Sequence, residues 1–124
     1  MITPKDINLE IFQGASYLKG WEIVDKNGDP IDLSGWSARC HFRLKVNDAA
    51  IILDSSTENG RMFIDQTPEY TRYGFDLSPE DTRGLTAKAY VYDVKLIDPT
   101  GAVARVQQGR VSVDPAVTRS WQQQ

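Results

Sequence analysis

A stretch of strict alternation between apolar and polar residues constrains the fold more than any other feature of this sequence. Residues 36–45 read WSARCHFRLK, with apolar side chains at even positions and polar or charged side chains at odd positions. Because successive side chains of a β-strand point to opposite faces, the pattern predicts a strand with one buried and one solvated face. The apolar face comprises Trp36, Ala38, Cys40, Phe42 and Leu44, and the polar face Ser37, Arg39, His41, Arg43 and Lys45.

Other segments predict further strands with less clear alternation, and the buried face of residues 15–24 is ambiguous. The last of them runs from about residue 102 to 113, and Gly109 is expected to mark a bulge there because the apolar phase shifts across it. Seven or eight short strands with turn signals between them predict an all-β fold, an antiparallel β-sandwich. The other segments are residues 7–12, 15–24, 51–54, 61–65, 71–77 and 90–96.

The connections between these segments carry turn residues. Asn27-Gly28 predicts a type I′ hairpin turn, in which both central residues have positive φ. Residues 98–101, DPTG, have the form of a type I turn. The residues expected to have structural roles in turns are Asn27, Gly28, Pro30, Gly35, Asp98, Pro99 and Gly101.

A single helical turn is expected near residues 78–84, within the stretch LSPEDTRGL. Ser78 would serve as the N-cap and Pro79 as the first helical residue. Glu80 and Asp81 would complete the first turn, where negative charge complements the helix dipole, and Gly84 would end it. The two acids therefore have a structural explanation, and no facing carboxylate is identified that would make them a glycosidase pair.

Length and charge restrict the organisation and the partners. A chain of 124 residues with net charge −3 is the size of one domain, which we expect at residues 1–113, followed by a tail at 114–124. Lys and Arg are scattered along the sequence without a basic stripe, so no nucleic-acid partner is expected. No run of about 18 apolar residues predicts a membrane span, and residues 1–10 lack the apolar region of a secretory signal.

Few residues offer chemistry. Cys40 and His41 are neighbours in the predicted strand and would point to opposite faces, which argues against a Cys–His catalytic pair. The acids around residues 25–32 superficially resemble a calcium loop, but Pro30 and Trp36 occupy the positions where that motif needs a glycine and a bidentate acid. No common nucleotide-binding, metalloprotease or hydrolase motif is present. We therefore predict no enzyme, no metal and no cofactor.

The aromatic residues have two possible uses. Most are in phase with buried strand positions and are expected in the core: Trp36, Tyr73, Phe75, Tyr90 and Tyr92. Trp121 instead lies in the polar tail, where it either anchors in a pocket of another chain or folds back on its own sandwich.

Three segments together resemble a known family. They are FQGASYLKGWEIVDKNGDPIDLSGWSARCHFR, TENGRMFID and YVYDVKLIDPTGAVARVQQGRVSVDPAVTR. Their order and spacing are similar to small phage virion proteins with the immunoglobulin-like N-terminal module of phage baseplate upper proteins and tail-fibre adaptors. The positions that carry the resemblance are Gly14, Asp25, Gly28, Pro30, Ile31, Asp32, Leu33, Ser34, Gly35, Tyr90, Val91, Tyr92, Asp93, Val94, Asp98, Pro99 and Gly101.

The resemblance implies an immunoglobulin-like fold and a non-enzymatic structural role in the virion, assembled in the host cytoplasm. It implies other virion proteins of the tail, baseplate or fibre as partners, with several copies in an assembly. From the composition of the tail we expect partner contacts at Val117, Arg119 and Trp121. A capsid decoration or head–tail connector subunit, and a module that binds glycans or the host surface through Trp21 or Trp121, remain alternatives.

Overall fold

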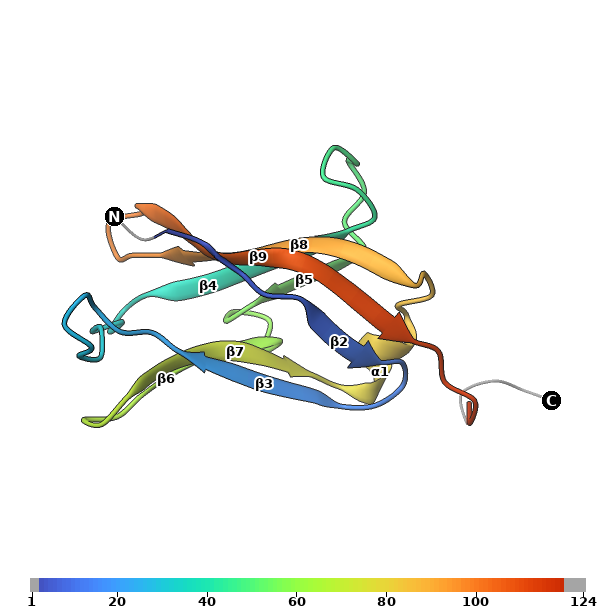
Figure 1. Cartoon of the computed structure of the whole chain (residues 1–124), viewed down its shortest axis with the longest axis horizontal. Helices are drawn as coiled ribbons and strands as arrows, with labels where there is room; N and C mark the ends of the chain where they lie inside the picture. The colour runs from blue at the N-terminus through green and yellow to red at the C-terminus, as the bar shows by residue number, and fades with distance from the viewer. Residues whose placement is uncertain (1–2, 120–124) are drawn as a thin grey trace.

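Two β-sheets face each other and form a sandwich (Figure 1). The computed structural model describes residues 3–119, and strands account for 50% and helix for 4%. The predicted all-β sandwich is confirmed. The elements are β1 Lys5–Asp6, β2 Leu9–Phe12, β3 Tyr17–Glu22, β4 Ser37–Arg43, β5 Leu53–Ser56, β6 Met62–Gln66, β7 Thr71–Leu77, α1 Pro79–Arg83, β8 Ala89–Ile97 and β9 Val103–Asp114.

The order of the strands is immunoglobulin-like. The larger sheet has the order β1-β9-β8-β4-β5, with β2 also paired to β9, and the smaller sheet has the order β3-β7-β6. In an immunoglobulin sandwich strands B, E and D lie in one sheet and strands C, F and G in the other. The smaller sheet matches B-E-D and the β4-β8-β9 part of the larger sheet matches C-F-G.

The N-terminal strands depart from the antiparallel pattern. β1 and β2 run parallel to β9, with Lys5 opposite Gln107 and Leu9 opposite Val111. Between the two strands the amide of Ile7 donates to the carbonyl oxygen of Gln108 at 2.9 Å. This segment therefore covers the edge of β9, and its division into two strands brings the number in residues 3–119 to nine.

The core forms from the apolar faces that alternation predicted. Ala38, Cys40 and Phe42 of β4 are buried, whereas Leu44 is 47% exposed because it lies beyond the end of the strand. The Phe42 ring lies 5.9 Å from that of Phe75 in the facing sheet. Burial of each such side chain contributes about 1.5–3 kcal/mol, so these contacts hold the layers together.

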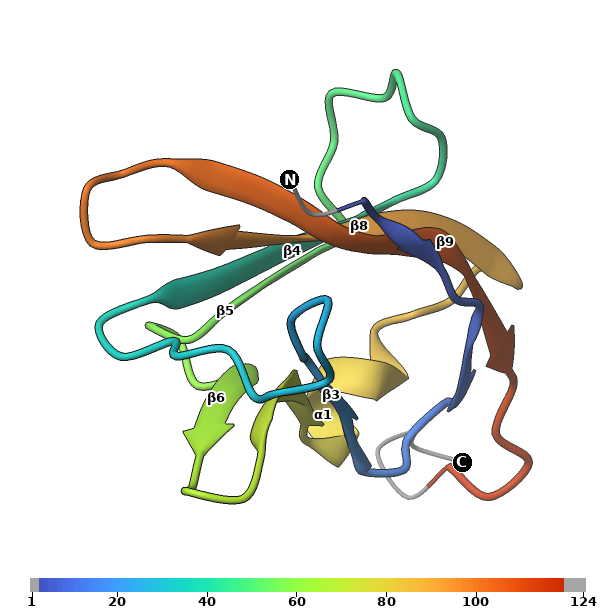
Figure 2. The same cartoon turned by 60° about the vertical axis from the view of Figure 1, so that its left-hand side comes forward.

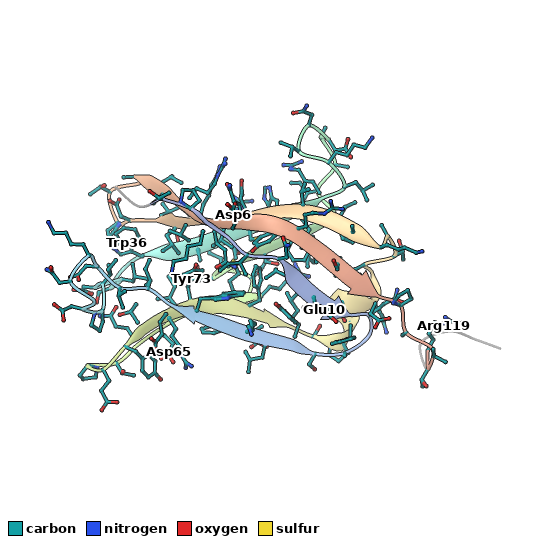
Figure 3. The ribbon with its side chains drawn as sticks, viewed as in Figure 1. Asp6, Glu10, Trp36, Asp65, Tyr73 and Arg119 are labelled. Carbon is teal, nitrogen blue, oxygen red and sulfur yellow. The ribbon has the colours of Figure 1, made fainter. Side chains whose placement is uncertain are left out.

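A buried polar group also joins the two sheets. The hydroxyl of Tyr73 on β7 donates to Oε1 of Gln107 on β9 at 2.6 Å, and Nε2 of Gln107 donates to the Tyr92 hydroxyl at 2.9 Å. Gln107 is fully buried, and Figure 3 shows Tyr73 between the sheets. Burial disfavours the phenolates, which raises the pKa of Tyr73 to about 12 and raises that of Tyr92 further.

The expected helical turn is confirmed as α1. Ser78 caps it by accepting from the amide of Asp81, and the Asp81 carboxylate accepts from the amide of Ser78. The two bonds satisfy amides that a helix start leaves without partners. The buried hydroxyl of Thr82 donates to the carbonyl oxygen of Ala15, so the turn is fastened to the chain between β2 and β3.

The bulge in β9 lies three residues before the predicted position. Val94 pairs with Gln107 and Lys95 pairs with Arg105, so Val106 is the extra residue and Gly109 pairs normally with Tyr92. Val106 and Gln107 are both buried although they are consecutive, which is the local signature of a bulge. The glycine has another function, because a Cβ there would collide with the carbonyl oxygen of Ile7.

Candidate interaction face on the larger sheet

The two predicted turns have the same backbone design. In the first, the amide of Gly28 donates to the carbonyl oxygen of Asp25 at 3.0 Å, and in the second Gly101 donates to Asp98 at 3.0 Å. Gly28 has φ +84° and Gly101 has φ +94°. Asn27 does not have positive φ, so the predicted type I′ turn is wrong. A type I turn closed by a left-handed glycine explains both sequences.

The carboxylates of the same two aspartates hold these turns in shape. Oδ1 of Asp25 accepts from the amides of Asn27 and Asp29, and Oδ1 of Asp98 accepts from those of Thr100 and Ala102. Among the acids that resembled a calcium loop, the Asp25 carboxylate thus accepts from backbone amides. Among residues 3–119, no three His, Cys, Asp or Glu side chains form a metal-binding group.

The chain crosses between the sheets after the first turn. Pro30 forms an isolated bridge with Val24, Leu33 is buried, and Gly35 has φ +78° before β4 begins. A Cβ on Gly35 would lie 3.1 Å from Cγ of Pro99, so the structure brings two of the predicted turn residues together. These residues shape the end of the sandwich.

The C-terminal segment leaves the sandwich after β9. The amide of Ala116 donates to Oε1 of Gln13 at 3.1 Å, and beyond this contact Val117 is 92% exposed. Nη1 of Arg119 donates to the carbonyl oxygen of Ala116 at 2.9 Å, and Figure 3 shows Arg119 past the end of β9. Trp121 lies outside the described residues.

Cys40 and His41 point to opposite faces of β4, as the alternation predicted. Cys40 is buried, and the pKa of its thiol is raised well above the ordinary value because burial disfavours the thiolate. Nε2 of His41 lies 3.3 Å from Oδ1 of Asp54 on the outer face, although the approach does not have hydrogen-bonding geometry. The two side chains cannot act together on a substrate.

Trp21 packs within its own sandwich. Its ring centroid lies 6.0 Å from that of Tyr73 and 6.0 Å from that of Phe75, and the residue is half-buried. Trp36 is also half-buried against the core. Neither ring stands free as a stacking platform for a sugar.

The outer face of the larger sheet gathers cations that are far apart in the sequence. Arg39 on β4 is directly opposite Lys95 on β8, which in turn is opposite Arg105 on β9. Four residues along β4, Arg43 is opposite Val91, which is opposite Arg110. We call Arg39, Arg43, Lys95, Arg105 and Arg110 the cationic face.

A hollow of about 470 Å³ spans the two rows and reaches Lys95 and Arg105 of the first. Its lining includes Arg43, Val91 and Arg110, together with Val46 from the loop between β4 and β5. Figure 2 shows this loop standing out from the larger sheet, and Nη1 of Arg43 holds it by donating to the carbonyl oxygens of Asp48 and Ala49 at 2.9 Å each. The loop is therefore one wall of the hollow.

Carboxylates balance only part of this charge. Arg39 pairs with Asp54 at 3.1 Å, and Arg105 lies 3.4 Å from Asp93. The hydrogen bond from Arg39 lowers the pKa of Asp54. Within residues 3–119, no ion-pair partner is found for Lys95 or Arg110.

Sequence reasoning missed the cationic face. Alternation places Arg39 and Arg43 on the solvated side of β4, but it does not say which residues of β8 and β9 lie beside them. Arg105 shares this face only because the bulge at Val106 reverses the alternation of β9 before Gln107. The alternation of apolar and polar residues across 103–113 shifts by one residue, and this shift is the sequence signal that could have revealed the position of Arg105.

Comparison of the sequence with known proteins identifies no family. No protein-family model matches the sequence, and a search of curated proteins gave no significant match. The strand order defines the fold as an immunoglobulin-like β-sandwich. Among residues 3–119, no helix has the length and hydropathy needed to cross a membrane.

Proposed function

We propose that the chain is a non-enzymatic structural protein of a bacteriophage virion. In this role it is an adaptor at a tail, baseplate or tail-fibre attachment site and acts through protein–protein contacts in several copies. The resemblance in the connector at 25–35, the strand at 90–94 and the turn at 98–101 supports the assignment. These segments form the crossing, the middle of β8 and the β8–β9 turn, which are positions that define the sandwich.

The observation that carries the contact role is the exposure of the segment after β9. Val117 is 92% exposed, and the amide of Ala116 donates a hydrogen bond to Gln13. An exposed terminal segment of this kind can order against a neighbour. The partner-binding roles of Val117, Arg119 and Trp121 belong to this proposal.

Deletion of residues 115–124 tests the proposal in particles. The truncated chain should keep its circular dichroism spectrum and thermal midpoint, because residues 115–119 contribute no side chain to the hydrophobic core. The test uses a phage that lacks the gene for this protein and receives the protein in trans. Particles made with the truncated chain should not contain it, whereas particles made with the full-length chain should. A full-length Gln13→Ala variant serves as a control that removes the hydrogen bond to Ala116 and leaves the segment present. Normal incorporation of the truncated chain would contradict the tail contact.

A capsid decoration or head–tail connector subunit is the second candidate. The same exposed segment serves either location, so the position of the chain in a density map of the intact particle decides between them. The glycan-binding alternative is less favoured because Trp21 packs on Tyr73 and Phe75. Binding of the isolated domain to a glycan array would support that alternative.

A further inference from the structure

We propose that the cationic face binds an extended, acidic segment of a partner protein. The inference deepens the proposed adaptor role and rests on it, since it assigns the chemistry of one contact. The face consists of outward side chains on three adjacent strands, so it is a rigid surface.

The row Arg39–Lys95–Arg105 breaks a rule of sheet stability. Like charges directly opposite each other on one face are destabilising, and here three cations lie side by side across β4, β8 and β9. Arg39 and Arg105 each have an aspartate nearby, but for Lys95 no partner is found within residues 3–119. Folding alone does not explain Lys95, and such local conflicts are typical of functional sites.

The charge of this face is opposite to that of the chain. Five cations line it, against the carboxylates Asp6, Asp54 and Asp93 and that of Glu58 beside Arg39, while the whole chain has net charge −3. The face is therefore a positive area on a negative protein. Complementarity of charge across an interface favours a negative partner.

The spacing of the rows matches an extended chain. Row Arg39–Lys95–Arg105 and row Arg43–Val91–Arg110 are four residues apart along β4, about 13 Å at the rise of a β-strand. A partner segment that lies along the strands has the same rise. It places acidic side chains i and i+4 over the two rows.

The other residues of the face favour a protein segment over a nucleic acid. Between the rows lie His41, Asp93 and Gln108, and Asp93 would repel a backbone with a phosphate at every nucleotide. Val91 and Val46 add apolar surface inside the hollow. A peptide with acids at i and i+4 and an apolar residue between them fits this arrangement.

The test uses a fluorescein-labelled peptide of the sequence Glu-Thr-Val-Thr-Glu-Thr-Val-Thr-Glu. The full chain should bind it in a fluorescence anisotropy titration at low salt, and binding should weaken as salt rises. Lys95→Glu and Arg110→Glu should each weaken binding at least tenfold, while Lys26→Glu makes the same charge change in an exposed turn and should not. A peptide of equal composition with its three glutamates adjacent should bind several-fold more weakly.

Lys95→Glu has a second expected effect that needs no ligand. The substitution interrupts the row of like charges. The midpoint of urea unfolding of the variant should therefore rise, even though the variant no longer binds the peptide. A mutation that improves the free protein and removes binding marks a residue kept for contact. Lys95→Gln should give a smaller change in the same direction.

Three results of the binding experiment would overturn the inference. They are equal binding of the peptide by the wild type and both charge variants, no binding by the wild type, and tighter binding of oligo-dT than of the peptide. If the wild-type chain is found in particles and Lys95→Glu is incorporated equally well, this inference fails and the adaptor role stands. Absence of the wild-type chain from particles would contradict the adaptor role itself.

Discussion

Tyr73 donates its hydroxyl proton to Oε1 of Gln107 at 2.6 Å and so joins the two sheets through their shared interior. Gln107→Leu removes this acceptor and leaves the Tyr73 hydroxyl buried without a partner. We expect the free energy of unfolding to fall by about 1–3 kcal/mol in urea titrations. The double variant Gln107→Leu/Tyr73→Phe removes both groups and should recover part of the loss. Additive losses in the double variant would contradict a direct interaction.

Buried tyrosines predict sensitivity to alkali. Burial raises the pKa of Tyr17 and Tyr73 to about 12, from an ordinary value of 10.0. The folded state therefore favours the neutral phenols, so their contribution is complete below pH 10 and is lost as pH rises towards 12. Phenolate absorbance and circular dichroism followed together should change in one transition in this range. If these phenols titrated near pH 10 while the circular dichroism spectrum stayed native, the prediction would be wrong.

Gly109 is expected to be essential for the attachment of the N-terminal strands. A Cβ there collides with the carbonyl oxygen of Ile7, so Gly109→Ala should displace β1 and β2 from β9 and cost about 1–3 kcal/mol. Hydrogen exchange measures the effect locally. The amide of Ile7, which donates to Gln108, should lose protection much more than that of Val94. An equal loss at both amides would indicate global destabilisation instead.

The two turn glycines with positive φ should each be needed for full stability of the fold. Gly28→Ala and Gly101→Ala each place a Cβ at φ near +84° or +94° and should lower the free energy of unfolding by about 1–2 kcal/mol. Gly84→Ala is the control, because Gly84 has φ −75° and space for a Cβ. It should be neutral or slightly stabilising. An equal loss for Gly84→Ala would show that conformation is not the cause.

Local patterns predicted much of the fold. Alternation placed Ala38, Cys40 and Phe42 in the core because strand parity is a property of each residue and its neighbours. The cap at Ser78 and the glycines of the two turns follow from equally local chemistry. The wrong prediction of a type I′ turn at Asn27 also has a local cause, since the Asn-Gly pair suits more than one turn type.

Long-range pairing explains what the sequence did not reveal. The parallel attachment of Leu9 to Val111 depends on which edge is free after the other strands have paired. The row of Arg39, Lys95 and Arg105 depends on the register of two pairings and on one extra residue. No local pattern contains this information, so the candidate site emerges only from the assembled sheet.

The attachment of β2 to β9 has a consequence for synthesis of the chain. Leu9 and Val111 are partners that lie far apart in the sequence, so β2 leaves the ribosome long before β9 exists. High contact order of this kind slows folding. The last step in assembly of the sandwich is therefore expected to be the capture of β1 and β2 by newly made β9.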